Sequence, residues 1–417
     1  MKEEETMEQR FKNILEMLVK YQTESPPARN TDPLQDEIQQ ILEEIGFEIQ
    51  RIPLYKNDSV INATLRGKDP TAPKLILNGH IDVAQVGESS EWTYPPFQLT
   101  EVDEYLYGRG VADMKGGMAA LLYVLERLHS EQLQPLGDII VQSVVGEEVG
   151  EAGTKTACEH APQADLGIVL DTSEQMAQGQ GGVVTGWITV SSRETIHDGA
   201  RLNMIHAGGG IYGASAIEKM TKVIQSLNEL ERHWAVTKSY PGMPAGSTTI
   251  NPAVIEGGRH PAFVADQCNL WVTVHYLPDE NHEEVIAEVE SHLNKMAEAD
   301  VWLRNNPLQY DWGGTSMIED KNEVFPSFTL PIDHPGYHLL KESHEKVLNQ
   351  PLQSNMSSTV TDGGWLEFFG IPTILYGPGE LKEAHSVDEK IKVTELEQFA
   401  EVLTQFLKEW YKHPKKG

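Results

Sequence analysis

The sequence predicts an α/β protein in which a mostly parallel sheet carries helices on both faces and is interrupted by a smaller α+β unit. Two observations lead to this fold class. Short apolar runs typical of buried strands alternate with amphipathic helical patterns over residues 1–182, and the same alternation returns over residues 317–417. Between these stretches the order changes to strand, helix, strand, helix, strand. We therefore expect a discontinuous first domain (1–182 and 317–417) and an inserted second domain (183–316).

The first domain begins with two amphipathic helices. Residues 7–21 and 34–45 each place apolar side chains at helical spacing, and Gly46 ends the second pattern. Further helical patterns occupy residues 118–128, 336–348 and 393–411. The strand-like runs are LIL (75–77), DIIVQSVV (138–145), LGIVL (166–170) and TILY (373–376). A parallel sheet built from such strands binds ligands at the carboxyl ends of its strands.

The inserted unit begins after a glycine-rich break, QGQGG (178–182), which we interpret as a flexible connection. The strand-like run VVTGWITV follows directly. Helical patterns at 214–232 and 279–297 then flank a strand-like stretch at 268–276, and a last strand follows. This order is typical of a small α+β unit.

Composition and charge exclude several classes of partner. The 417 residues contain 33 Lys+Arg and 63 Asp+Glu, a net charge of −30, whereas a nucleic-acid groove or an anionic membrane surface requires excess cations. No apolar run is long enough to span a bilayer, and the acidic start is unlike a signal peptide. The two cysteines form neither a CxxC pair nor a disulfide framework. We expect a cytoplasmic protein with no nucleic-acid or membrane partner.

Histidine and carboxylate side chains follow each of the four strand-like runs, and an aspartate precedes the helical pattern at 118–128. These residues are His80, Asp82, Glu147, Glu148, Asp171, His385 and Asp113. Because the carboxyl ends of parallel strands meet at one edge of a sheet, we expect five metal ligands to gather there. The five are His80, Asp113, Glu148, Asp171 and His385. Histidine with carboxylates and no thiolate suits zinc, or a similar divalent ion that keeps an open coordination position.

The His-x-Asp pattern of His80 and Asp82 has a mechanical interpretation. Residues two apart on a strand point the same way, so Asp82 can reach the second ring nitrogen of His80 and fix its tautomer. The alternative is a histidine that is only hydrogen-bonded to a neighbour in a polar turn.

The adjacent acids Glu147 and Glu148 point in different directions and cannot share one task. One can bind metal while the other takes a proton from water as a general base. The alternative is a pair of exposed acids at a strand end, which is the common case for an isolated pair. Here the apolar strand before them, together with Gly150 and Gly153 after them, favours a structured loop.

Four segments resemble one known family. They are GHIDVA (79–84), YGRGVADMKGGMAA (107–120), VVGEEVGEAG (144–153) and EAHSVDE (383–389). In this order they resemble the dinuclear-zinc aminoacylase and carboxypeptidase family, which includes acetylornithine deacetylase and succinyl-diaminopimelate desuccinylase. The resemblance implies a zinc-peptidase-like catalytic domain interrupted by a lid domain through which two subunits form a homodimer.

The resemblance also implies two zinc ions per subunit, which Co²⁺ or Mn²⁺ could replace, with Asp113 bridging them. The remaining ligands would be His80 and Asp171 for one ion, and Glu148 and His385 for the other. The positive charge of two zinc ions is balanced by three carboxylates and one hydroxide, so the centre can be buried without a large penalty.

The catalytic residues that the resemblance implies lie in both domains. Glu147 would be the general base, and Asp82 would orient His80. His206, in HAGGG, would stabilise the tetrahedral oxyanion, from the partner subunit in relatives, and Asn251 would touch substrate. The alternative for His206 is a structural histidine. The glycines of this segment also match a nucleotide-binding GxGxxG pattern, but no strand-like run leads into them.

The sequence departs from the family at the end of the lid strand. Most relatives carry Asp-x-Arg there, and the arginine grips a substrate carboxylate, whereas this chain has Thr273 and His275. Segments at 26–35, 191–210, 257–268 and 360–365 instead resemble one subgroup, the formylaminopyrimidine deformylases of thiamin salvage. Their small-molecule substrate is a formyl amide of a heteroaromatic amine with no carboxylate.

This subgroup adds Asp362 and Gly363, in VTDGGW, as candidate substrate contacts, with the alternative that Asp362 only caps a turn. Two other functions stay open on the sequence. One is an acetylornithine deacetylase-like deacylase of N-acyl amino acids, or a dipeptidase, with the same metal centre and a different lid. The other is an inactive relative that binds a ligand. Such relatives tend to lose the base or a ligand, whereas every position is filled here.

Overall fold

The computed structural model describes residues 7–150, 152–161, 163–204 and 212–412. The chain divides into two compact units. Unit 1 comprises the residues up to Gln180 together with those from Phe328 onward, and unit 2 comprises Gly181–Ser327.

Unit 1 is built on a mixed sheet of eight strands. In spatial order these are β18 (Ser354–Ser357), β10 (Ala177–Gln180), β19 (Thr373–Leu375), β9 (Leu166–Val169), β4 (Leu75–His80), β8 (Ile139–Val144), β3 (Asp58–Leu65) and β2 (Glu48–Tyr55). The four central strands β19, β9, β4 and β8 run parallel to one another. β3 and β2 extend the sheet antiparallel at one edge, and β10 pairs antiparallel with β19 at the other. The predicted mostly parallel centre is therefore confirmed.

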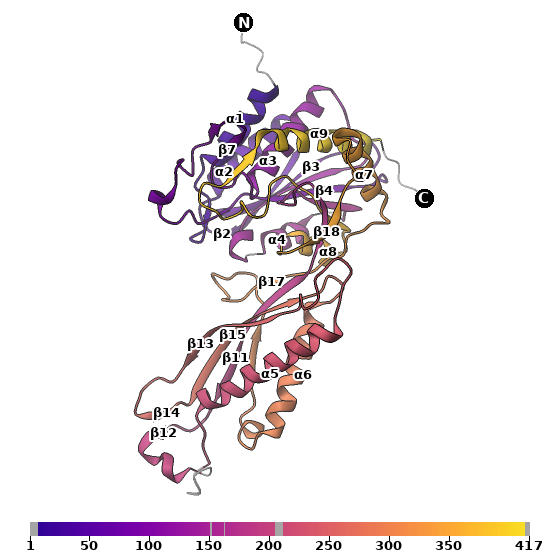
Figure 1. The fold of residues 1–417 in the computed structure, drawn as a ribbon. Coiled ribbons are helices and arrows are strands. Elements are labelled where there is room, and N and C mark those ends of the chain that lie inside the picture. The colour runs from indigo at the N-terminus through magenta and orange to yellow at the C-terminus, as the bar shows by residue number, and fades with distance from the viewer. Residues whose placement is uncertain (1–6, 151, 162, 205–211, 413–417) are drawn as a thin grey trace. The chain divides into compact units, whose positions relative to one another are not determined.

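Helices cover both faces of this sheet, because its central strands are apolar on both sides. The helices are α1 (Met7–Val19), α2 (Asp32–Glu44), α3 (Lys115–Ser130), α4 (Gly153–His160), α7 (Pro335–Leu348), α8 (Gly363–Phe368) and α9 (Val393–Trp410). Leu75 and Leu77 of β4 pack into a cluster with α1, α3 and α9, whereas Ile76 points to the other face, toward Cys158 of α4 and Leu366 of α8. Figure 1 shows α3 and α9 on one side of the sheet and α4 and α8 on the other.

Two segments of unit 1 differ from the sequence prediction. The helix predicted at 34–45 starts at Asp32, because Pro33 fits the first turn, where no backbone donor is needed. Part of the predicted flexible break at 178–182 is strand β10, which pairs with β18 and β19. Thr361 stabilises this polar strand, because the side-chain oxygen of Gln180 accepts hydrogen bonds from both the backbone amide and the hydroxyl of Thr361.

Short elements complete unit 1. β1 (Glu24–Ser25) pairs with β5 (Val83–Ala84), and β20 (Lys390–Lys392), β7 (Tyr105–Tyr107) and β6 (Thr100–Val102) form a small antiparallel sheet. The 3₁₀ turns are η1 (Ser89–Glu91) and η2 (Glu147–Val149). Because β20 pairs with β7, the segment after His385 lies beside the loop that leads to Asp113.

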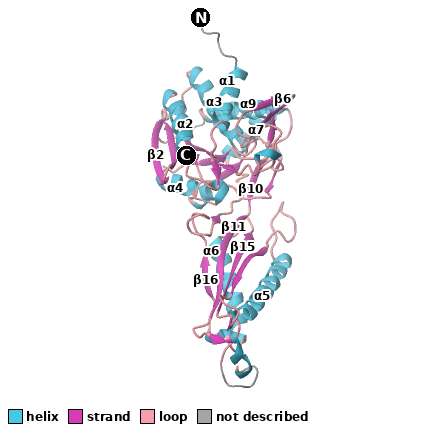
Figure 2. Ribbon diagram, turned by 90° about the vertical axis from the view of Figure 1, so that its left-hand side faces the viewer, coloured by secondary structure: helices cyan, strands magenta, loops and turns pink. Residues whose placement is uncertain are grey.

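Unit 2 is a sheet packed against two long helices, α5 (Ala216–Thr237) and α6 (His282–Ala299), which Figure 2 shows beside it. The strands, in spatial order, are β13 (Ile250–Gly257), β15 (Gln267–Tyr276), β11 (Gly182–Ser191) and β16 (Gln309–Trp312). The smaller elements are β12 (Ile196–His197), β14 (Phe263–Val264), β17 (Val324–Phe325), η3 (Asp198–Asn203) and η5 (Leu303–Asn305). The unit ends at Ser327 rather than at the predicted 316, because β17 pairs with Val183 and Val184 of β11.

Within the described ranges, no helix combines the length and the apolar character that crossing a membrane requires.

Candidate metal centre

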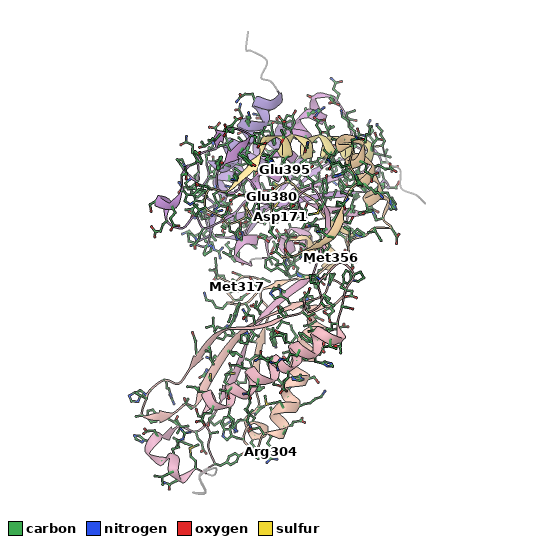
Figure 3. The ribbon with its side chains drawn as sticks, in the orientation of Figure 1. Asp171, Arg304, Met317, Met356, Glu380 and Glu395 are labelled. Carbon is green, nitrogen blue, oxygen red and sulfur yellow. The ribbon has the colours of Figure 1, made fainter. Side chains whose placement is uncertain are left out.

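The central parallel strands of unit 1 bring four predicted site residues to one edge of the sheet. β4 ends at His80, which lies opposite Val144, the last residue of β8. Glu147 and Glu148 follow β8 in the turn η2, and Asp171 follows β9, which pairs with β4 on its other side. Figure 3 labels Asp171 within unit 1. The carboxyl ends of adjacent strands therefore place these side chains together.

Asp113 reaches the same edge from the loop before α3. Gly117 permits this approach, since a Cβ there would lie 2.1 Å from the carbonyl oxygen of Leu170, the residue before Asp171. A Cβ on Gly116 would lie 2.3 Å from the carbonyl oxygen of Val111. Gly117 thus lets the start of α3 pack directly on backbone beside the end of β9, and Gly116 lets the loop at Val111 pack closely on the same helix start.

The carboxylate of Asp113 lies between two imidazoles. Its Oδ1 is 3.2 Å from Nε2 of His80, and its Oδ2 is 3.3 Å from Nε2 of His385. On the first side Asp171 Oδ2 is 3.7 Å from His80 Nε2, and on the second Glu148 Oε2 is 2.7 Å from His385 Nε2. The five side chains form two groups that share Asp113.

The donor atoms of this cluster fit a divalent cation. His80, Asp113 and Glu148 each offer one ligand atom, and these atoms lie within 4.8 Å of one another. Nδ1 of His80 lies 3.0 Å from the carbonyl oxygen of Asp82, so in the neutral imidazole Nδ1 carries the proton and Nε2 presents its lone pair. That Nε2 is buried and has no hydrogen-bond donor among the described residues, although it faces the Asp113 carboxylate. A proton or a metal ion can lie between two such facing acceptors, and the donor set of imidazoles and carboxylates suits a divalent ion.

Backbone amides orient two of the candidate ligand carboxylates. The amide of Ala84 donates to Oε1 of Glu148 at 3.0 Å, and the amide of Thr172 donates to Oδ1 of Asp171 at 2.6 Å. In each case the other oxygen of the same carboxylate faces a histidine. This orientation leaves one oxygen of each ligand directed into the cluster.

The charges of the cluster shift its pKa values strongly. Asp113 and Glu148 raise the pKa of His385 to about 10. Burial opposes a charge on His80, but the carboxylates of Asp113, Asp171 and Glu147 raise its pKa well above the usual value. Burial raises the pKa of Glu148 to about 7, and the Asp113 carboxylate adds to this. The carboxylates of the cluster therefore favour a positive charge beside the imidazole nitrogens of His80 and His385.

Glu147 lies beside the ligand groups rather than within them. Its Oε2 is 4.0 Å from His80 Nε2, farther than the contacts that Asp113 and Asp171 make with the same nitrogen. Burial raises the pKa of Glu147 well above its usual value, and Glu148 raises it further, while His80 counters both. A carboxyl with a raised pKa can accept and return a proton near neutral pH.

Asp82 differs from the sequence-based interpretation in one respect. The contact with Nδ1 of His80 at 3.0 Å comes from its carbonyl oxygen, whereas its carboxylate Oδ1 is 3.7 Å away. The buried carboxylate instead accepts hydrogen bonds from the amides of Gly146, at 2.8 Å, and Glu148, at 3.2 Å. Asp82 therefore orients His80 through its backbone and holds the Glu147–Glu148 turn through its side chain.

The predicted substrate contacts fall in different places. Asp362 is buried in unit 1, neither of its carboxylate oxygens has a hydrogen-bond partner among the described residues, and its side chain does not cap α8. Burial raises its pKa to about 7. Gly363 is buried as well, and a Cβ would lie 2.6 Å from the ring of Phe328. Asn251 is exposed on β13 in unit 2, opposite Thr273, and His206 lies outside the described residues.

Comparison with known proteins places this site in a family. The family model described as "Peptidase family M20/M25/M40" matches residues 76–409. Two relatives, from Halalkalibacterium halodurans and Bacillus subtilis, are named N-formyl-4-amino-5-aminomethyl-2-methylpyrimidine deformylase. They are 56% and 50% identical over 398 residues, and each alignment covers 95% of this chain and 93% of the relative.

Solved structures agree on the fold. The structure of a tripeptidase from Staphylococcus aureus superposes with a TM-score of 0.69 at 21% identity, covering 97% of this chain and 99% of that one. The chain is a hydrolase of amide bonds, and it belongs to peptidase family M20/M25/M40.

Proposed function

We propose that the chain hydrolyses the formyl amide of N-formyl-4-amino-5-aminomethyl-2-methylpyrimidine, a step of thiamin pyrimidine salvage in the cytoplasm. The observation that carries the proposal is the 56% identity, over 95% of the chain, to a relative that bears the name of this deformylase. Water attacks the formyl carbon, the C–N bond breaks, and the products are formate and the free aminomethylpyrimidine.

The proposed centre holds two Zn²⁺ ions, which Co²⁺ or Mn²⁺ could replace. Asp113 would bridge them, since its two oxygens face different imidazoles. His80 and Asp171 would hold one ion, and Glu148 and His385 the other. When bound, such ions polarise the carbonyl and lower the pKa of water.

The chain's own groups would move the proton and orient the reactants. Glu147 would take a proton from the attacking water and return it to the leaving amine. This role needs a carboxylate that lies near the metal ligands but is not itself a ligand. Asp82 would hold the turn that carries Glu147, through its bonds to Gly146 and Glu148. His206 would stabilise the oxyanion, from a partner subunit if the family pattern holds.

Three further residues are proposed to contact the pyrimidine. Asn251 is exposed and faces Thr273 across the β13–β15 pair. The two carboxylate oxygens of Asp362 accept no hydrogen bond at normal geometry from the described residues, which suits an exocyclic amino group; both oxygens are buried, so contact requires neighbouring side chains to move. Gly363 keeps the backbone next to Asp362 close to Phe328.

A substrate panel tests the reaction. We expect the zinc-loaded protein to hydrolyse the formylpyrimidine with a kcat/KM at least about 100-fold above that for N-acetylornithine or a dipeptide, since a site built for one amine leaves buried polar groups unpaired with another. Removal of metal with a chelator should abolish the reaction, and added Zn²⁺ should restore it. Preference for an N-acyl amino acid would favour a deacetylase, and inactivity with bound metal would indicate a ligand-binding relative.

The strand β15 favours the formylpyrimidine over an amino-acid substrate. Thr273 and His275 stand at the positions where an enzyme that acts on an amino-acid substrate is expected to carry Asp-x-Arg, with the arginine binding the substrate carboxylate. Burial lowers the pKa of His275, so this imidazole is neutral at pH 7 and offers no fixed cation. A neutral heteroaromatic amide needs no such cation.

A homodimer is proposed to form through unit 2. The edge strand β13 exposes Val254 (43%) and Ile255 (54%), and Ile217, at the start of α5, lies against Gly257 of the same strand. A second copy of the chain can cover this apolar edge by strand pairing. We expect the double change V254D/I255D to convert a dimer, of twice 46.5 kDa, to a monomer in sedimentation experiments.

Val236→Asp is the control for this dimer experiment, because Val236 is an 86% exposed valine of α5 outside the edge strand. It should leave the dimer intact. A wild-type monomer at micromolar concentration, or a dimer that survives the double change, would contradict the proposed interface.

A further inference from the structure

Arg109 and Glu389 form a buried ion pair beside the proposed metal ligands. Arg109 belongs to the loop before Asp113, and Glu389 follows His385 and immediately precedes β20. Their side chains are 2% and 0% exposed, and Arg109 Nη1 lies 2.7 Å from Glu389 Oε2. Neither side chain contacts a proposed ligand side chain through any hydrogen bond of the described residues.

The carboxylate of Glu389 organises the backbone that leads to Asp113. Its Oε1 accepts hydrogen bonds from the amides of Ala112, at 2.8 Å, and Asp113, at 3.1 Å. Its Oε2 accepts from the amide of Gly110, at 3.0 Å, besides the Arg109 guanidinium. Four donors on two oxygens hold the loop in one conformation.

The guanidinium of Arg109 connects this loop to the segment that carries His385. Its Nη2 donates to the carbonyl oxygen of His385, at 3.3 Å, and to that of Gln85, at 3.1 Å. The group also lies over the ring of Trp92, 5.0 Å from its centroid. The pair thus ties the backbone at His385 to the backbone at Asp113, although these residues are far apart in sequence.

We propose that Arg109 and Glu389 are positioning residues that fix Asp113 and His385 relative to each other, so that the sites for both ions are formed before an ion binds. The inference rests on the proposed dinuclear function and adds to it the residues that set the geometry of its bridging ligand. Outer groups that orient a metal ligand commonly change metal affinity by about 10- to 100-fold when they are replaced.

Glu389→Gln tests the proposal with little change in size. A glutamine has one oxygen and one amide nitrogen, and each position of the carboxylate faces two donors. In either orientation the amide nitrogen therefore opposes two N–H groups, and the loop at Asp113 has to move. Arg109→Lys is the second variant, because one ammonium group cannot reach Glu389, Gln85 and His385 at once.

The measurement is metal affinity, by competition with a chromophoric chelator, and the absorption spectrum of the Co²⁺-loaded protein. We expect both variants to bind Zn²⁺ about 10- to 100-fold more weakly than wild type and to show altered Co²⁺ bands. Asp58→Asn is the matched control. Asp58 is equally buried in unit 1 and accepts from the amides of Arg29 and Thr31, but none of its hydrogen bonds reaches a proposed ligand.

The outcomes separate the two proposals. If the wild type binds no divalent metal, the proposed function fails. If the wild type binds metal and E389Q and R109K bind it equally well, or if D58N weakens binding as much, the positioning role is overturned. If E389Q does not fold, R109K decides by the same measurement, and failure of both to fold would show a requirement for the fold instead of a positioning role.

Discussion

Replacing Glu147 by glutamine is expected to lower kcat for the formylpyrimidine by about 10² to 10⁴ fold while the protein keeps its metal. The amide cannot take a proton from water, so the general base is lost. The contacts that define the two ligand groups do not involve Glu147, which lies 4.0 Å from His80 Nε2. The measurements are single-turnover rates and the metal content per chain, with zinc supplied to saturation.

Glu148→Gln is the matched control for this experiment, since it alters the neighbouring carboxylate of the same turn. Glu148 Oε2 is 2.7 Å from His385 Nε2, so we expect this variant to lose metal affinity rather than the proton-transfer step alone. An E147Q protein with nearly wild-type kcat would contradict the assignment of Glu147 as the general base. Loss of metal from E147Q would show that Glu147 is itself a ligand.

Asp113→Ala is expected to lose both metal ions. Its carboxylate is the group that faces both imidazoles, at 3.2 and 3.3 Å, so its removal damages two sites at once. We expect affinity for Zn²⁺ to fall by more than about 100-fold, because changes to outer groups alone cost about 10- to 100-fold. Metal content after dialysis and the shift of Tm on adding Zn²⁺ report this loss.

Asp171→Ala provides the comparison for Asp113. Of the two imidazoles, Asp171 lies near His80, at 3.7 Å, so its removal should weaken the binding of one ion and leave the other ion bound. Stoichiometry after dialysis should then separate the two variants, with metal retained in D171A and lost in D113A. A D113A protein that still binds two ions would contradict the assignment of Asp113 as the bridging ligand.

Apolar periodicity was sufficient to predict the central strands and most helices. β4, β8, β9 and β19 each contain an apolar run, because a strand buried on both faces carries apolar residues on both, and the buried polar residues Asn78 of β4 and Gln142 of β8 hydrogen-bond to each other. The polar strand β10 has no such pattern, and its place in the sheet depends on Thr361, which satisfies the buried Gln180 side chain. The edge strand β2, partly exposed and containing Pro53, was likewise not predicted.

Site residues at strand ends could be selected from the sequence, but their hydrogen-bond partners could not. The position of His80 or Asp171 relative to an apolar run is a local property of the chain. The contact of the Asp82 carboxylate with Gly146 and Glu148 joins separate strands. Glu389 lay within the EAHSVDE segment, yet only its folded neighbours, the amides of Ala112 and Asp113, indicate what it does.

The sequence by itself determined the α/β class, the apolar strands, and the histidines and acids that follow them, because each of these depends on residues adjacent in the chain. The tertiary structure decided that the carbonyl oxygen of Asp82 contacts the ring of His80 and that Asp113 faces two imidazoles. It also decided that Arg109 and Glu389 connect the segments that carry Asp113 and His385. These contacts unite segments distant in sequence, and burial strengthens those of His80, Asp82, Arg109 and Glu389 because water cannot replace their partners.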